Sequence, residues 1–457
     1  MTLIIVLLLI LSYLLIATGH LTGVNKSAIA IFLAAIGWVV YICWGTDFVM
    51  ALHPGAYAEF LGDTEASSQN VKNFIYDSIF LKYVGKAAAI VMYLLATMSI
   101  IEILNNNGCF DFIGEWIRTR NSKRLLWTIT LATFILSANL DNLTTTIVML
   151  IIMRDIVKSR PQRMLIGSAI MLAAICGGCF TVIGDPTGLI LWSNEAVTAT
   201  HFSSYLVLPA ITAWVVPTIF INRQLPSRLD IEWIVAPFRG DDTRLNRWQR
   251  ILMLIVAIGG LWFVPTFLSI TRLPAFLGAL VVLGVLWVVN EAFNRKLINT
   301  DQMSRHRVPR VIQYEAYQQL LFVMGIMLGI GVIRETGVLA NVADWIDSNI
   351  DNLWVVGILS GLLSCLVDSF TIAVSDIAFY DVWNAGDYAQ NGAYWKVIAY
   401  CTAVGGCLLS VGSASGMALM KMEHIHLGWY FKNITFKVFL GWLVGLAILW
   451  AEIYFVS

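Results

Sequence analysis

Long apolar stretches recur along the whole chain and are separated by short polar segments. An α-helix needs about 20 mostly apolar residues to cross a bilayer. The stretches that approach this length predict about ten transmembrane helices, at residues 3–19, 27–44, 81–104, 164–192, 205–221, 251–269, 273–293, 317–334, 397–420 and 434–455. The pattern therefore predicts an all-α polytopic membrane protein.

Two further apolar stretches, residues 125–153 and 353–380, have flanks of one charge sign. The first lies between basic side chains: Arg118, Arg120, Lys123, Arg124, Arg154, Lys158, Arg160 and Arg163. The second lies between mostly acidic ones: Glu335, Asp344, Asp347, Asp351, Asp381 and Asp387. Lys and Arg favour the cytoplasmic side of a membrane, so each stretch is expected to return to the side from which it enters. We therefore predict two re-entrant hairpins, with tips near residues 137–145 and 364–371.

The polar segments between the helices give the orientation. Residues 222–250 hold six Arg and residues 294–315 hold five Lys or Arg, so both are expected in the cytoplasm. Residues 45–80 hold one Lys and five acidic residues, and we interpret them as an external loop.

Three pairs of segments match at a nearly constant spacing of about 228 residues. SANLDNLT (137–144) resembles SCLVDSFT (364–371), GGCFTVIGDPTG (177–188) resembles GGCLLSVGSASG (405–416), and GCFDFIGEWI (108–117) resembles GVLANVADWI (337–346). Since the hairpins enter from opposite sides, we interpret the copies as inverted repeats, an organisation typical of secondary transporters.

This interpretation divides the chain into four parts. Residues 1–80 form N-terminal helices and the external loop, and residues 222–316 form a cytoplasmic linker and central helices. Repeat 1 spans 81–221 and repeat 2 spans 317–457. The Gly- and Pro-containing segments inside 164–192 and 397–420 do not support continuous helices, so both are predicted to be broken helices.

The composition agrees with this class. The chain is 58% hydrophobic and 13% charged, whereas soluble domains carry about 25% charged residues. Its 29 basic and 29 acidic residues cancel, which excludes an overall basic nucleic-acid-binding protein.

Ionisable residues within apolar stretches mark functional sites by default. Asp141 and Asp185 are the only charges in their stretches, and polar oxygens surround them in the sequence. Because hard cations prefer oxygen ligands, we predict one monovalent cation site, for Na⁺ or Li⁺, dominated by these two carboxylates. The predicted cation- and proton-binding residues are Asp141, Asn142, Thr144, Thr145, Asp185, Thr187, Asp368, Ser369, Thr371, Ser413 and Ser415.

Carboxylates in a desolvated site titrate closer to cellular pH than carboxylates in water. A cation that needs the ionised form therefore competes with protons for the same oxygens, which favours cation/proton antiport. Glu102, near the end of its span, is a candidate proton relay or an interfacial residue. No cofactor beyond the transported ions is expected.

Other classes remain as alternatives. The carboxylates could merely cap hairpin tips. An intramembrane aspartyl protease also uses two membrane Asp residues, but Ile183 breaks the GxGD pattern and the second half would have no role, so we expect no enzyme. A channel or receptor would not transport against a gradient.

The motifs LSANLDNLTTTIVM (136–149) and GGCFTVIGDPTGLILW (177–192) resemble those of the NhaD-type sodium/proton antiporters, in the ion transporter superfamily that includes arsenite and dicarboxylate transporters. The resemblance implies exchange of Na⁺ or Li⁺ for protons, by a homodimer in the bacterial inner membrane. It places Asp141, Asn142, Thr144, Asp185 and Asp368 at the positions of the family's motif residues, with Ser413 and Glu102 also matching.

The chain departs from the family pattern at two places. The second hairpin has Asp368-Ser369-Phe370-Thr371 where Asp-Asn followed by Pro is usual. The first break reads GDPTG (184–188), which is similar to the anion-transporting relatives. A transporter of the same fold for oxyanions or carboxylates is therefore the alternative function.

Overall fold

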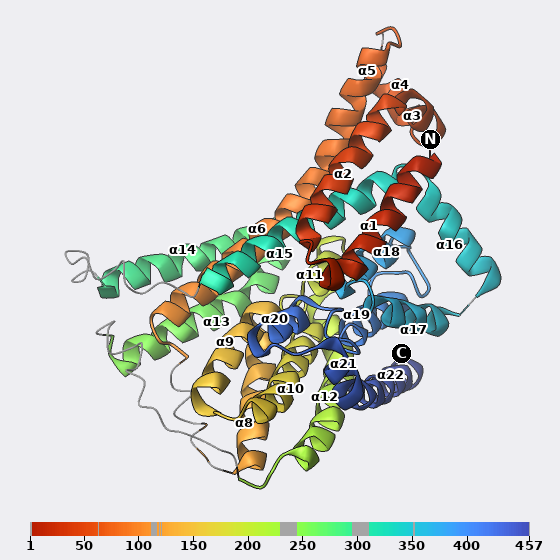
Figure 1. Cartoon of the computed structure of the whole chain (residues 1–457). Coiled ribbons are helices and arrows are strands. Elements are labelled where there is room, and N and C mark those ends of the chain that lie inside the picture. The colour runs from red at the N-terminus through yellow and green to blue at the C-terminus, as the bar shows by residue number, and fades with distance from the viewer. Residues whose placement is uncertain are drawn as a thin grey trace.

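The computed structural model describes residues 2–62, 64–110, 117, 119, 121–228, 245–294, 310–350 and 352–456, and these residues form helices and no strands (Figure 1). Much of the two basic loops, together with Arg118, Arg120 and Asp351, lies outside them. The first helices are α1 (Thr2–Thr22), α2 (Lys26–Cys43), α3 (Gly45–Leu52), α4 (Pro54–Leu61), α5 (Ser68–Phe74), the π-helical η1 (Ile75–Phe80) and α6 (Leu81–Asn106). Then follow α8 (Ser122–Ser137), α9 (Asn142–Ile156), α10 (Arg160–Cys179), α11 (Pro186–Ser193), α12 (Ala199–Gln224), α13 (Arg247–Thr271), α14 (Ala275–Asn294) and α15 (Arg310–Arg334). The last are α16 (Val338–Asn349), α17 (Leu353–Ser364), α18 (Ser369–Phe379), α19 (Ala393–Gly405), α20 (Ala414–Glu423), α21 (Leu427–Tyr430), η4 (Phe431–Thr435) and α22 (Phe436–Val456).

Nine helices in the described part of the chain are long and apolar enough to cross a membrane. This confirms the prediction of an all-α polytopic membrane protein. The stretch 397–420, counted among the ten predicted spans, is divided between α19 and α20, neither of which has the length of a span.

Helices cover residues 45–52, 54–61 and 68–80, most of the segment that was predicted from its charge to be an external loop. The short helices α3 and α4 lead into α5, η1 and α6, which together run as one helix from Ser68 to Asn106. Phe48, Tyr57 and Phe74 are buried there, and the Tyr57 and Phe74 rings meet edge to face. The segment is acidic overall, but its buried apolar side chains provide enough packing for it to fold as helices.

The two apolar stretches with like-charged flanks fold as helical hairpins, α8–α9 and α17–α18. Both begin with an Asn cap, because Asn121 accepts from the amides of Lys123 and Arg124, and Asn352 accepts from those of Trp354 and Val355. After each hairpin comes a helix that stops at a glycine-rich segment, α10 or α19, and then a short helix, α11 or α20. The same order of elements thus occurs twice.

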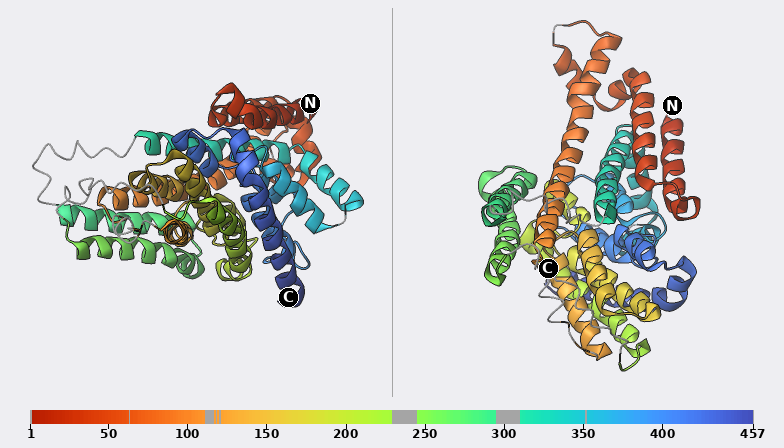
Figure 2. Two further views of the ribbon diagram at one scale, coloured as in Figure 1. Left: turned by 60° about the horizontal axis from the view of Figure 1, so that its bottom comes forward. Right: turned by 60° about the vertical axis from the view of Figure 1, so that its left-hand side comes forward.

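The packing divides the long helices into two bundles (Figures 1 and 2). We call α1, α2, α6, α13, α14 and α15 the frame bundle, in which α2 and α6 both pack against α15. We call α8–α12 and α17–α22 the hairpin bundle, in which α10 packs on α8 and α9, and α19 packs on α17 and α18. Each bundle contains helices from both halves of the chain, so the bundles do not coincide with the two predicted repeats.

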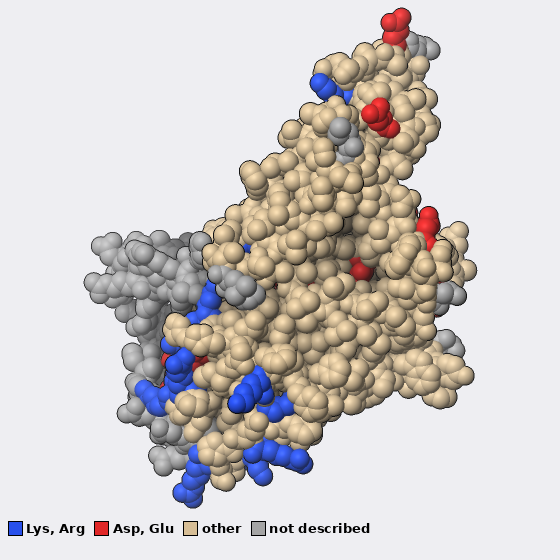
Figure 3. All heavy atoms as spheres, turned by 45° about the vertical axis from the view of Figure 1, so that its right-hand side comes forward, with Lys and Arg blue, Asp and Glu red and all other residues tan. Residues whose placement is uncertain are grey.

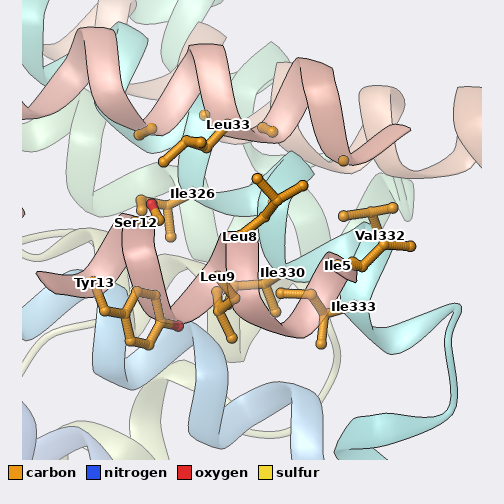
Figure 4. A pocket seen from close by; sticks show the side chains of 15 residues that line it. Ile5, Leu8, Leu9, Ser12, Tyr13, Leu33, Ile326, Ile330, Val332 and Ile333 are labelled. Carbon is orange, nitrogen blue, oxygen red and sulfur yellow. The ribbon is translucent and has the colours of Figure 1, made fainter. Parts of the chain in front are cut away.

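An apolar contact holds α1 within the frame bundle. Figure 4 shows Leu8, Leu9, Leu33 and Ile330 from α1, α2 and α15 gathered around a small cavity of about 30 Å³. Tyr13 lies at the edge of this cavity, and its hydroxyl bonds to Ser375 of α18. The frame bundle therefore reaches the second hairpin through α1.

Basic side chains gather at one end of the molecule. On the face drawn in Figure 3, most Lys and Arg lie at the lower end, with a few acidic atoms among them, whereas the upper end shows mainly Asp and Glu with one basic side chain. The exposed residues Lys123, Arg124, Arg154 and Lys158, which flank the first hairpin, are basic. Because Lys and Arg favour the cytoplasmic side, we predict that the basic end faces the cytoplasm.

Candidate functional site

Four helices begin at the hairpin tips and helix breaks, and a predicted site residue caps each of them. Asp141, Asp185, Asp368 and Ser413 are the N-cap residues of α9, α11, α18 and α20. Asp and Ser favour this position because a side-chain oxygen accepts from backbone amides that have no partner in the helix. The capping role predicted as an alternative is therefore real, and the remaining oxygens decide whether the site does more.

Asp141 is buried and uses one carboxylate oxygen for its cap. Its Oδ2 accepts from the Thr144 amide at 2.9 Å and from the Thr144 hydroxyl at 3.0 Å. Its Oδ1 is buried and has no hydrogen-bond partner in the described structure, and the same holds for the hydroxyl of Thr145. Asp141 therefore keeps one oxygen for a proton or a cation.

Asp185 lies beside Asn142, the residue that follows Asp141. Its Oδ2 accepts from the Thr187 amide at 2.9 Å, and its Oδ1 accepts from the Asn142 side-chain amide at 2.6 Å. The second bond joins the first hairpin to the first helix break. Asn142 thus holds the tip of α9 against the start of α11.

Asp368 is the most fully bonded of the three carboxylates. Its Oδ1 accepts from the amides of Phe370 and Thr371 at 3.1 and 3.4 Å. Its Oδ2 lies 2.5 Å from Lys26 Nζ, an ion pair in which the Asp368 side chain is 3% exposed. Lys26 belongs to α2, so this pair joins the frame bundle to the hairpin bundle.

The hydroxyl groups of the second half lie at the start of α20 and α18. Ser413 accepts from the Gly416 amide at 3.1 Å, while the buried hydroxyls of Ser415 and Thr371 have no described partner. Ser369 is half-buried, and its amide donates to Gly412 O across the break. The second half therefore offers hydroxyl oxygens where the first half has a second carboxylate.

A cavity of about 20 Å³ lies where these elements meet. Most of the predicted site residues line it, namely Asn142, Asp185, Thr187, Asp368, Ser369, Ser413 and Ser415, and Lys26 lines it too. Asp141, Thr144, Thr145 and Thr371 are not among its described lining residues. The structure thus brings Asp185 and Asp368 together around the cavity, whereas Asp141 contributes only its neighbour Asn142 to the described lining.

The structure also contains two larger cavities. A vestibule of about 520 Å³ shares Lys26, Gln319 and Ala414 with it and is also lined by the exposed residues Val24 and Lys421. The other cavity, of about 270 Å³, contains the Arg334–Asp381 ion pair and shares none of the described lining residues with the inner cavity. The inner cavity therefore shares described lining residues with the vestibule and not with this second cavity.

The donors suit a hard cation. Carboxylate and hydroxyl oxygens surround the inner cavity, and such oxygens are the preferred ligands of hard cations. In the described part of the chain, no group of three or more His, Cys, Asp or Glu side chains is placed to hold a metal ion.

Comparison with known proteins gives the family. The family model described as citrate transporter, CitMHS, matches residues 1–381. The chain belongs to this transporter family. It is 32% identical to sodium/proton antiporter 1 of Arabidopsis thaliana over 79% of the chain and 62% of that relative, so the chain spans less than two thirds of that relative's length.

Two other relatives are covered more completely. Sodium/proton antiporter 2 of Arabidopsis thaliana is 30% identical over 79% of the chain and 84% of that protein. The Na⁺/H⁺ antiporter NhaD of Vibrio cholerae is 25% identical over 85% of the chain and 81% of that protein. The resemblance to NhaD-type antiporters that the motifs indicated is thereby confirmed, within a family whose members are transporters.

Lys26 is the site residue that the sequence analysis missed. It stands at the first position of α2, where a lysine before an apolar stretch is usually an interfacial anchor. Its partner Asp368 is far away in the sequence, and no local pattern indicates that the two meet. Glu102, the predicted relay, is half-buried on α6 and is not among the described residues that line the inner cavity, so its role stays a prediction.

Proposed function

We propose that this chain is a secondary active transporter that exchanges Na⁺ or Li⁺ for protons by alternating access. The observation that carries the proposal is the inner cavity, where the half-buried carboxylate of Asp185 and the buried carboxylate of Asp368 meet hydroxyl oxygens at the boundary of two helix bundles. The names of the antiporter relatives point to the same activity.

The size of the inner cavity favours a small ion. Its volume of about 20 Å³ exceeds the roughly 10–15 Å³ that one water molecule needs. Pockets for organic ligands are larger by an order of magnitude, at about 300–1,000 Å³. A single monovalent cation fits the cavity, whereas a carboxylate substrate does not.

The helix N-termini also favour a cation. Anions bind at such termini because free backbone amides point at them. Here the amides of Thr144, Thr187 and Phe370 already donate to the carboxylates of Asp141, Asp185 and Asp368. The site therefore presents negative oxygens rather than free amide donors.

Proton coupling follows from competition for the same oxygens. A cation that binds a carboxylate displaces a proton from it, and a proton that binds excludes the cation. Asp185 and Asp368 line the cavity, and Asp141 adds a buried oxygen that has no described partner. Movement of the hairpin bundle against the frame bundle would carry the loaded or protonated site from one side to the other.

One observation supports the alternative of anion transport. The vestibule of about 520 Å³ is large enough for a carboxylate or oxyanion, and both Lys26 and Lys421 line it. The CitMHS family description names citrate. We rank this function second because such an anion would have to pass the small, carboxylate-lined inner cavity.

We further propose that the protein is a homodimer in the inner membrane of a bacterium. Antiporter relatives from bacteria support the location, and the resemblance to NhaD-type antiporters supports the assembly. The mass of the purified protein, corrected for bound detergent, tests the dimer.

The test uses purified protein in liposomes that contain a pH-sensitive dye. Na⁺, Li⁺ or K⁺ is added at several pH values, with Asp141→Asn and Asp185→Asn as variants. A dye response to Na⁺ or Li⁺ that both variants lack supports antiport. No response to any cation from folded protein contradicts it, and uptake of labelled citrate or arsenite then tests the anion alternative.

A further inference from the structure

The site contains a cation that belongs to the protein. Lys26 Nζ lies 2.5 Å from Asp368 Oδ2 and 4.6 Å from the centre of the Phe322 ring. The Lys26 side chain is 24% exposed, so the ammonium group is partly withdrawn from water. Its carboxylate partner and the ring together replace part of its hydration.

Asp368 has one oxygen that is not committed to the backbone, and Lys26 holds it. Oδ1 accepts from backbone amides, whereas Oδ2 accepts from Lys26. A transported cation that uses Asp368 as a charged ligand must therefore compete with the ammonium group. We infer that Lys26 is a tethered competitor of the transported cation: its ammonium group binds Asp368 when no cation is bound and is displaced when a cation binds. This inference rests on the antiport function proposed above.

The position of Lys26 fits this role. Lys26 lines both the vestibule and the inner cavity, so an ion that reaches the inner cavity through the vestibule passes it on the way to Asp185. Because α2 and α18 belong to different bundles, the pair also ties the bundles together when the site is empty. A cation or a proton bound to Asp368 breaks this ion pair, whereas the pair remains when the site is ionised and holds no cation. The pair would thus prevent the transporter from returning empty.

The first test measures cation binding. Lys26→Met removes the charge and keeps a side chain of similar length. With the competitor gone, the Na⁺ or Li⁺ concentration that gives half-maximal thermal stabilisation should fall about tenfold or more, the worth of one charge-assisted hydrogen bond. Measurement at alkaline pH keeps competition from protons small. A gain in affinity is a result that structural damage does not produce.

Two variants serve as controls for this measurement. Lys26→Arg keeps a cation opposite Asp368 and should keep the half-saturating concentration near the wild-type value. Lys437→Met removes an ammonium group that donates to Gln224 Oε1 at 2.7 Å, away from the cavity, and should also leave this concentration unchanged.

The second test measures coupling. Proteoliposomes receive an inward-negative potential, and uptake of radioactive Na⁺ is recorded together with proton movement. Lys26→Met should take up Na⁺ with fewer protons moved per cation than wild type, because the empty site is no longer tied.

The outcomes separate this inference from the antiport proposal. If folded wild type and folded Lys26→Met both show no transport or binding of any cation, the antiport proposal is contradicted. This inference then fails with it. A wild type that responds, beside a folded Lys26→Met with unchanged or weaker cation affinity, overturns the role of Lys26 alone.

Discussion

Gly177 stands where α10 crosses the first hairpin, and replacing it with Ala should disturb the site. A Cβ at Gly177 would lie 2.3 Å from the carbonyl oxygen and 2.9 Å from the Cα of Phe134. Both atoms belong to the backbone of α8, so no side chain can rotate away. To reach an ordinary contact of about 3.4 Å, the helices must separate by about 1 Å.

The cost follows from this separation. Overpacking a well-packed interior costs about 1–3 kcal/mol, and two rigid backbones place Gly177→Ala at the upper end, about 3 kcal/mol. The shift would also move the hairpin tip, because Ser137 donates to Ala174 O at 2.6 Å in the same crossing. We therefore expect lower thermal stability and a lower maximal rate of cation exchange.

The assay compares unfolding midpoints in detergent with transport rates in liposomes. Gly284→Ala is the matched control, because a Cβ there meets nothing within 4 Å and Ala is the better helix former. Gly405→Ala should behave like Gly177→Ala, since its Cβ would lie 2.5 Å from Gly361 O in the matching crossing of α19 and α17. If Gly177→Ala is as stable and active as Gly284→Ala, the close crossing is not what positions the hairpin.

Three further predictions concern contacts around the site. Glu423→Ala removes the buried carboxylate that lies 2.9 Å from Arg163 Nε and 3.6 Å from Arg154 Nε, so it should lower stability by about 3 kcal/mol, and adding Arg163→Met should recover part of the loss in chemical denaturation. Ser413→Ala should lower stability by about 1 kcal/mol because it removes the cap of α20, whereas Ser413→Asp should keep the cap. Equal unfolding midpoints for Ser413→Ala and Ser413→Asp would contradict this prediction. Tyr13→Phe should lower the free energy of unfolding by no more than about 1.5 kcal/mol, because Ser375 keeps its bond to Thr371 O at 2.8 Å. A larger loss of unfolding free energy would show that the Tyr13 hydroxyl contributes more than this one bond.

The sequence predicted the helices, both hairpins and both breaks because their signals are local. Gly and Pro at GDPTG and Asp at each tip are residue types that favour the end or the cap of a helix. The segment 45–80 was predicted wrongly as a loop, since charge alone outweighed the buried aromatic residues that fold it into helices.

The site was harder to predict because it depends on directions and distant partners. Asp141 was expected to share the cation cluster with Asp185, yet its Oδ2 turns back to Thr144 and Asp141 is absent from the described lining of the inner cavity. Lys26 reaches Asp368 across the boundary of two bundles, and a single sequence holds no local sign of that contact.

The central claim is that cations and protons compete for the carboxylates of one site. The most direct measurement adds Na⁺ or Li⁺ to purified, weakly buffered protein in detergent and records the protons released. We predict proton release that saturates with cation concentration in wild type and is lost in Asp185→Asn. Cation binding without proton release, or equal release from folded Asp185→Asn, would contradict the account.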